Sequence, residues 1–97
     1  MTKAEIIDQI AQGTGLTKIE TEAVVNGFIT LVMNAVIDGE SVELRGFGSF
    51  RPKHRAARVA RNPKTKEKID IPERFVPHFK PARDFRDAVE SGLASEI

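Results

Sequence analysis

The N-terminal part of the chain shows the apolar spacing of a helix. Three isoleucines between positions 6 and 10 fall at helical intervals, and Thr2 precedes Glu5 by the three positions of an N-terminal capping box. Gly13 and Gly15 follow the apolar positions, and glycine commonly ends a helix. The pattern therefore predicts a short first helix that stops at these two glycines.

A second, longer helix is predicted from the next capping pair, Thr17 and Glu20, to Asp38-Gly39. A polar stripe recurs in it every four residues, and nearly every other side chain from 23 to 37 is apolar. The stripe consists of Glu22, Asn26, Thr30 and Asn34. So wide an apolar face needs partners on more than one side, and one short neighbouring helix cannot cover it. The pattern favours a dimer.

The period then changes to that of a strand. Val42 and Leu44 alternate with polar residues, which predicts a half-buried strand. Gly46-Phe47-Gly48 allows a tight turn or a close approach of the backbone, and a second strand follows it. Apolar alternation resumes near Ile69 and leads into a returning strand that ends near Phe79. These segments predict a sheet with a long hairpin.

A last short helix is predicted after the returning strand. Pro81 suits its first turn, and Arg83 can pair with Asp87 one turn further on. Phe85 and Val89 would form its inner face. Two helices, a sheet with a long hairpin and one terminal helix make this an α+β chain.

The most basic segment, residues 51–68, carries eight lysines or arginines and one acid. Its charge is +7 while the whole chain is +1, so the remaining residues sum to −6. Asn62-Pro63 is a turn dipeptide, and the flanking residues 55–61 and 66–71 can pair as two strands. A basic hairpin of this kind attracts phosphate. The alternative is a solvated loop without a partner.

Length and composition also favour an oligomer. Ninety-seven residues make one domain, and little chain remains for a core once the basic arm is set aside. The sequence has no cysteine, so no disulfide or thiolate metal site can compensate, a usage that fits a reducing cytoplasm. The N-terminus has no apolar signal region. The apolar run from 23 to 37 is too short and too polar to predict a membrane span.

The sequence offers little for catalysis. His54 and His78 have no ligand spacing around them; His54 is most simply an arm residue near phosphate, and His78 a partly buried strand residue. Residues 46–50 match a glycine-rich phosphate loop only weakly, because the third glycine is missing and a strand follows. We therefore expect no catalytic residue, no metal and no cofactor.

Glycines, aromatic residues, arginines and an Asn-Pro turn recur at a specific spacing in two stretches. These are Gly46-Phe47-Gly48-Ser49-Phe50 and, after Arg55 and Arg58, Arg61-Asn62-Pro63-Lys64-Thr65. The spacing resembles the signature of the bacterial HU and integration host factor family. The resemblance implies an α+β intertwined dimer, whose helical body and β-sheet saddle extend into two β-ribbon arms. Residues 1–50 and 72–90 would form the body, about 51–71 the arm, and 91–97 a frayed C-terminal tail.

The resemblance also implies how DNA is bound. The arms would follow the minor groove, and Pro63 at the arm tip would wedge between base pairs and kink the duplex. Phe47, Phe50 and Phe79 match the aromatic dimer core. The implied DNA-binding residues are Lys3, Arg45, Arg51, Lys53, Arg55, Arg58, Arg61, Asn62, Pro63, Lys64, Lys66, Lys68, Lys80, Arg83 and Arg86.

Within the family, residues 43–46 and 76–81 are more similar to the integration host factor β-subunit than to HU. In that subunit, the Glu and Arg before the glycine help to set sequence preference. Here they are Glu43 and Arg45, and on one strand face Glu43 can hold the guanidinium; a plain exposed ion pair is the alternative. The chain departs from the family at Val59-Ala60 and at Lys66, which replaces the usual glycine after the tip threonine.

The expected function is that of a non-enzymatic architectural protein of the bacterial nucleoid, located in the cytoplasm. Its partners would be double-stranded DNA and a second subunit, giving a homodimer or a heterodimer with a related chain. We expect no membrane and no small-molecule substrate. A sequence-selective protein and a general compactor both remain open, and a scaffold whose basic arm docks an acidic protein is the less favoured alternative.

Overall fold

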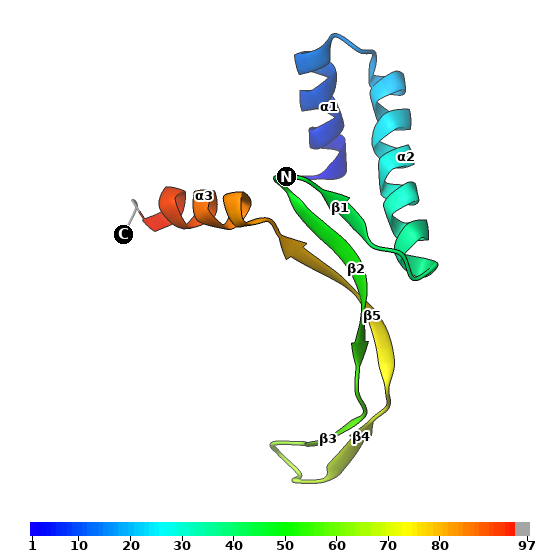
Figure 1. Cartoon of the computed structure of the whole chain (residues 1–97), viewed down its shortest axis with the longest axis vertical. Helices are drawn as coiled ribbons and strands as arrows, with labels where there is room; N and C mark the ends of the chain where they lie inside the picture. Colours follow the sequence, from blue (N-terminus) through cyan, green and yellow to red (C-terminus); the bar gives the residue numbers. More distant parts are fainter. Residues whose placement is uncertain (95–97) are drawn as a thin grey trace. The chain divides into compact units, whose positions relative to one another are not determined.

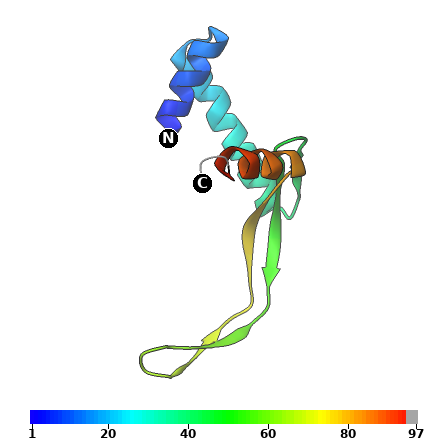
Figure 2. The same ribbon diagram turned by 90° about the vertical axis from the view of Figure 1, so that its left-hand side faces the viewer.

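The structure of the protein is a computed structural model that describes residues 1–94. The chain divides into two compact units, Met1–Asn34 and Ala35–Ile97, which are described separately. Figures 1 and 2 show a helical hairpin in the first unit and a long two-stranded ribbon in the second. The elements are those of the predicted α+β chain.

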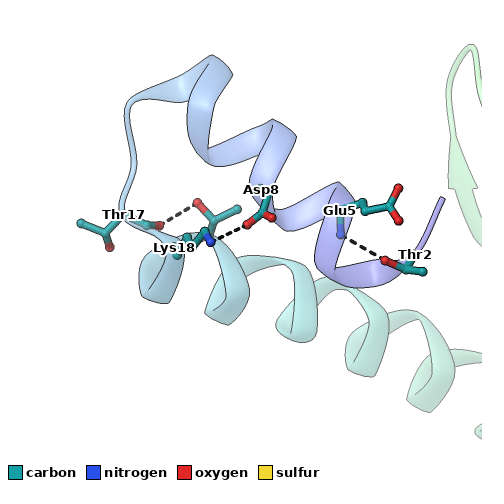
Figure 3. Close-up of polar contacts among 6 residues, drawn as sticks. Thr2, Glu5, Asp8, Thr17 and Lys18 are labelled. Atoms are coloured by element: carbon teal, nitrogen blue, oxygen red, sulfur yellow. Dashed lines mark hydrogen bonds and ion pairs between the residues drawn. The ribbon is translucent and has the colours of Figure 1, made fainter.

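The first unit begins with α1 (Lys3–Thr14), whose start is capped as predicted. The backbone N–H of Glu5 donates to Oγ1 of Thr2 at 3.2 Å, which satisfies one of the free N–H groups of the first turn (Figure 3). Gly15 ends the helix in a left-handed conformation (φ 77°), and its N–H donates to the carbonyl of Ala11. Gly13 lies inside the helix, so the prediction that it helps to stop α1 is wrong.

The second helix, α2 (Lys18–Ile37), opens with a reciprocal cap. The N–H of Glu20 donates to Oγ1 of Thr17 at 3.1 Å, and the N–H and Oγ1 of Thr17 donate to the Glu20 carboxylate at 3.3 and 2.8 Å. These hydrogen bonds from Thr17, that of the side chain first, lower the pKa of Glu20 below its ordinary value. An ion pair between Lys18 and Asp8, 3.0 Å long, joins the two helices (Figure 3).

One copy of the chain leaves most apolar side chains open to solvent. The only buried apolar residues within 1–94 are Ile7 and Ala11. On α2, Ile19 is 82 % exposed and Leu31 is 72 % exposed, and these belong to the apolar face that the sequence pattern predicted. A folded protein rarely exposes so large an apolar surface unless another surface covers it.

By length and composition alone, α2 also qualifies as a candidate membrane span. The apolar run from 23 to 37 lies within a helix of 20 residues, and it is the whole helix, polar first turns included, that meets this criterion. The core helix of a soluble protein meets the same criterion. The polar stripe along α2 and the acids in its first turns favour a helix that packs against protein.

The second unit is built on a three-stranded antiparallel sheet. Its strands are β1 (Val42–Leu44), β2 (Gly48–Arg55) and β5 (Arg74–Pro81), in the order β1-β2-β5. A separate hairpin of β3 (Arg58–Arg61) and β4 (Lys68–Ile71) continues the ribbon. The ladder stops at the pair Arg55–Arg74 and resumes at Arg58–Ile71. The predicted hairpin is confirmed, with strands shorter than the predicted 55–61 and 66–71.

The terminal helix, α3 (Arg83–Ala94), follows β5. Pro81 is the last residue of β5, so the prediction that it occupies the first helical turn is wrong. The predicted contact between Arg83 and Asp87 is present, with Nε 3.7 Å from Oδ2. Residues 91–94 are helical and therefore correct the prediction of a frayed tail from 91, whose residues 95–97 lie outside the described part of the chain.

Four phenylalanines form an aromatic cluster where the sheet meets α3. Ring centroids of Phe50 and Phe79 are 4.8 Å apart, those of Phe47 and Phe79 are 5.1 Å apart, and those of Phe47 and Phe85 are 5.7 Å apart. Gly48 lets the strands approach, because a Cβ on it would lie 2.5 Å from the carbonyl oxygen of Lys80. The close approach predicted for the glycine pair is therefore confirmed at Gly48.

Candidate nucleic-acid interface

The register of β2 against β5 sorts basic and apolar side chains onto opposite faces of the sheet. Residues directly opposite one another in an antiparallel pair point to the same side. The apolar face has the pairs Phe50–Phe79, Pro52–Pro77 and His54–Phe75. The other face, called the cationic face below, consists of Ser49, Arg51, Lys53 and Arg55 on β2 and Arg74, Val76, His78 and Lys80 on β5.

The cations of this face have no acidic partners. Among residues 1–94, ion pairs join Lys18 to Asp8 and Arg83 to Asp87, and His54 contacts Glu73; none of these contacts includes a residue of the cationic face. Arg55 stands directly opposite Arg74, and like charges in that position destabilise a sheet. An anion on this face relieves the repulsion, and phosphate oxygens suit arginine and lysine donors.

Sequence reasoning missed two residues of this face. Arg74 and His78 lie outside the predicted DNA-binding set, yet they stand opposite Arg55 and Arg51, which belong to it. The missing signal is the register, because alternation along one strand does not say which residue of a distant strand lies opposite. His78 is half-buried in β5, as the sequence predicted.

His54 does not lie among the cations of the sheet. It is on the apolar face, where its Nε2 atom is 3.0 Å from Oε1 of Glu73 and its ring centroid is 5.2 Å from that of Phe75. The interpretation of His54 as an arm residue near phosphate is therefore not supported by its contacts. Its carboxylate partner and aromatic neighbour give it a structural role at the end of the sheet.

The β3–β4 hairpin carries the predicted turn at its tip. The N–H of Lys64 donates to Oδ1 of Asn62 at 2.9 Å, and the N–H of Lys66 donates to the Asn62 carbonyl at 2.8 Å. The N–H of Asn62 donates to the carbonyl of Glu67 and closes the loop. Asn62 therefore organises the turn with both its side chain and its backbone. Pro63 follows it and is exposed.

Lys66 adopts a backbone conformation that glycine adopts more readily. Its φ of 61° makes it the only residue other than glycine with a positive φ among the described residues. The left-handed conformation costs an L-residue about 1–2 kcal/mol. The turn therefore has a backbone conformation typical of glycine although residue 66 is a lysine. The replacement of the usual family glycine by Lys66 has not changed the type of turn.

The hairpin places its basic residues on both of its faces. Arg58 is opposite Ile71 on one face, and Arg61 is opposite Lys68 on the other. Lys64 and Lys66 lie in the tip between the two strands. The predicted arm residues are thus brought together along one ribbon, which continues from the sheet that carries the cationic face (Figure 1).

The remaining predicted residues are distributed elsewhere. Lys3 begins α1 in the other unit, and Arg83 and Arg86 lie in the first turns of α3. Arg45 is exposed in the turn after β1. Within residues 1–94, no ion pair joins Arg45 to Glu43, so the predicted holding of the Arg45 guanidinium by Glu43 is absent from the structure.

The phenylalanines assigned to a dimer core do come together. Phe47, Phe50 and Phe79 are in mutual ring contact, and Phe85 of α3 adds a fourth ring that the resemblance did not supply. Phe47 remains 43 % exposed in a single copy. That a second subunit covers this cluster stays a prediction.

A helical hairpin, an antiparallel sheet with a cationic face and a basic β-ribbon define a β-ribbon DNA-binding protein. Comparison with known sequences leads to the same class. The family described as bacterial DNA-binding protein matches residues 1–90, and the chain belongs to this family. The match confirms the resemblance to HU and integration host factor.

Curated relatives cover nearly the whole chain. The integration host factor β-subunit of Marinobacter nauticus is 43 % identical over 94 residues, which is 96 % of both chains. That of Photobacterium profundum is 38 % identical and covers 98 % of this chain and 100 % of its own. These likenesses favour the β-subunit branch of the family.

Solved structures share the fold. The Anabaena HU–DNA cocrystal structure superposes with a TM-score of 0.84 at 42 % identity and covers 92 % of this chain and 97 % of that one. HU from Thermotoga maritima superposes with a TM-score of 0.65 at 26 % identity, over 92 % and 98 % of the two chains. The predicted α+β fold of HU type is confirmed.

Proposed function

We propose that this protein is an architectural protein of the bacterial nucleoid, which binds double-stranded DNA as a dimer and bends it. The observation that carries the proposal is a sheet face whose cations lack acidic partners and which continues into a basic β-ribbon. A DNA complex of a related HU protein supports it. The family is one of DNA-binding proteins, and no enzymatic step is part of the proposal.

The proposed bending of DNA depends on the positions of the basic side chains and of Pro63 on the ribbon. Basic side chains along the cationic face and the β3–β4 hairpin would hold phosphates on both sides of a minor groove, and Pro63 at the tip would enter between two base pairs. Unstacking one step costs a few kcal/mol, and smooth bending of a 20–30 bp site costs about 1–6 kcal/mol more. Contacts between basic side chains and phosphates along the bent duplex offset the free-energy costs of unstacking and bending.

A second subunit completes the proposal. The apolar face of α2 is open in a single copy, and two arms are needed to hold a duplex at two kinks. The partner is a second copy or a related chain, because the relatives include β-subunits of integration host factor. The cytoplasmic nucleoid is the location that this function requires.

The test is a gel shift with a duplex of about 35 bp, slightly longer than a bent site of 20–30 bp. The parent protein should shift the duplex at low salt, and its affinity for the duplex should fall steeply as the salt concentration rises. A double variant, Arg55→Gln with Arg74→Gln, removes two cations of this face from each subunit and should lower the magnitude of the salt slope by about 1.8 for each subunit whose two arginines meet phosphates. His54→Gln on the opposite face of β2 is the matched control and should leave the slope unchanged.

An unshifted duplex at low salt would refute DNA binding. In that case, capture of acidic proteins by the basic hairpin would become the better explanation of its charge. A shifted duplex with equal slopes for parent and double variant would show that DNA is held elsewhere than on the cationic face.

Sequence preference is the finer part of the proposal, and Arg45 carries it. It is exposed beside the sheet without a carboxylate partner among the described residues, so its guanidinium is free to enter a minor groove and sense its width. Arg45→Ala should lower binding to a selected duplex by about 1–3 kcal/mol and binding to a scrambled duplex by less. Equal losses in a competition assay would make Arg45 a phosphate contact and favour a general compactor.

A further inference from the structure

Four polar side chains of the cationic face stand in two adjacent cross-strand pairs. Ser49 is opposite Lys80, and Arg51 is opposite His78. Side chains in such positions have Cβ atoms about 4.5–5.5 Å apart. The Nη2 atom of Arg51 donates to Oγ of Ser49 at 3.2 Å, which links the two pairs along β2. The result is one cluster with a guanidinium, an ammonium, a hydroxyl and an imidazole.

This cluster has the composition of a phosphate site. The guanidinium keeps further N–H donors beyond the one used on Ser49, the ammonium supplies a point charge, and the hydroxyl can donate as well. Arg51 and Lys80 are exposed, whereas Ser49 and His78 are half-buried and therefore more restricted. Neither Arg51 nor Lys80 forms an ion pair within residues 1–94.

Cations surround His78 on this face of the sheet. Its charged neighbours on β2 are Arg51, directly opposite, and Lys53 on the diagonal; on its own strand it has Lys80. The only carboxylate on this face of the three-stranded sheet is Glu43, which stands opposite Ser49 on β1.

Resting on the proposed DNA binding, we propose that Ser49, Arg51, His78 and Lys80 form one backbone-phosphate site, at which His78 takes up a proton when DNA binds. A phosphate oxygen beside the imidazole favours the imidazolium over the neutral ring, because a nearby opposite charge stabilises the charged form. Imidazole changes charge between about pH 5 and 8, which brings this step into the physiological range. Affinity for DNA therefore rises as the pH falls.

The chain offers a matched control because it has only two histidines. His54 lies on the apolar face of the same sheet and is already paired with Glu73, so it faces away from a phosphate on the cationic face. The experiment measures binding of a duplex of about 35 bp by fluorescence anisotropy at about pH 6 and pH 8, over a series of salt concentrations, for parent, His78→Asn and His54→Asn.

For each His78 that meets a phosphate, the magnitude of the parent's salt slope should be larger at pH 6 than at pH 8 by about 0.9, and the affinity near 0.1 M salt should be about fivefold to tenfold higher. His54→Asn should keep this difference and His78→Asn should lose it. If His78→Asn does not fold by circular dichroism, His78→Lys provides the same test, because a fixed charge should give equally steep slopes at both pH values.

Two outcomes separate this inference from the function on which it rests. If the parent binds the duplex at low salt with the same slope at both pH values, or if His78→Asn keeps the pH dependence, the phosphate site is refuted while DNA binding stands. If the parent does not bind the duplex at either pH, the proposed function itself is refuted.

Discussion

Lys66, at the tip of the arm, has a left-handed backbone conformation that is unfavourable for a residue with a side chain. Lys66→Gly should relieve about 1–2 kcal/mol of backbone strain, offset in part by about 0.4–1 kcal/mol from the greater freedom of glycine in the unfolded chain. Amide hydrogen exchange at positions 62, 64 and 66, whose N–H groups are hydrogen-bonded in the turn, should therefore slow in the variant. The lost ammonium should lower the magnitude of the salt slope of DNA binding by about 0.9 for each Lys66 that meets a phosphate.

The two effects of Lys66 can be separated with a second substitution. Lys66→Asn also removes the charge but keeps a residue that tolerates positive φ. It should match Lys66→Gly in the salt slope and lie between parent and Lys66→Gly in exchange. Faster exchange in Lys66→Gly than in parent would show that the lysine side chain stabilises the turn.

Substitution of Pro63 tests DNA bending separately from DNA binding. Pro63→Ala keeps every charge, and the turn is organised by hydrogen bonds of Asn62 that this substitution leaves in place. The salt dependence of affinity should then stay nearly unchanged, while the bend measured by energy transfer between end-labelled dyes should decrease because the rigid wedge is lost. A bend as sharp as that of the parent would reduce Pro63 to a turn residue.

At the scale of elements, the start of α2 depends on an ionised carboxylate. Hydrogen bonds from Thr17 lower the pKa of Glu20 in the folded protein below its ordinary value of 4.5. A group of this kind stabilises the fold above its unfolded pKa, and this contribution is lost as the pH falls through the folded pKa. The stability difference between parent and Glu20→Gln should therefore shrink on acidification from neutral pH to below pH 4.5.

Thermal unfolding followed by circular dichroism measures this difference. Thr17→Val removes the hydroxyl that donates to Glu20 and should reproduce the reduced pH response. A gap between parent and Glu20→Gln that stays constant through this range would show that the carboxylate at the cap contributes no pH-dependent stability.

At the scale of the whole molecule, the open face of α2 predicts association. Light scattering after size exclusion should give twice the chain mass of 10.7 kDa at micromolar concentration. Leu31 is 72 % exposed in one copy, so Leu31→Asp would be nearly neutral in a monomer. In a dimer that covers this face, the buried charge should dissociate or unfold the protein.

Asn34→Asp is the control for that substitution. It introduces the same charge on the same helix, but in the polar stripe, and should leave the mass and the unfolding temperature close to those of the parent. A well-folded parent of single-chain mass, or a Leu31→Asp variant as stable as Asn34→Asp, would contradict the dimer.

Features set by neighbouring residues could be predicted from the sequence. The capping pair of Thr17 with Glu20, the turn at Asn62 and the alternation at Val42 and Leu44 all lie where the pattern put them. Each depends on contacts between residues a few positions apart, for which the chemistry of the side chains is sufficient. The basic arm was likewise visible as a local excess of charge.

Tertiary structure decided which of these residues face one another. The cationic face, with Arg74 and His78 in it, exists because β2 and β5 pair in one register, and a shift by one residue would move every side chain to the other face. The same dependence explains why His54 lies on the apolar face with Glu73. Alternation along a strand specifies two faces, but only the pairing of residues far apart in the sequence determines which side chains share a face and which anion they can bind together.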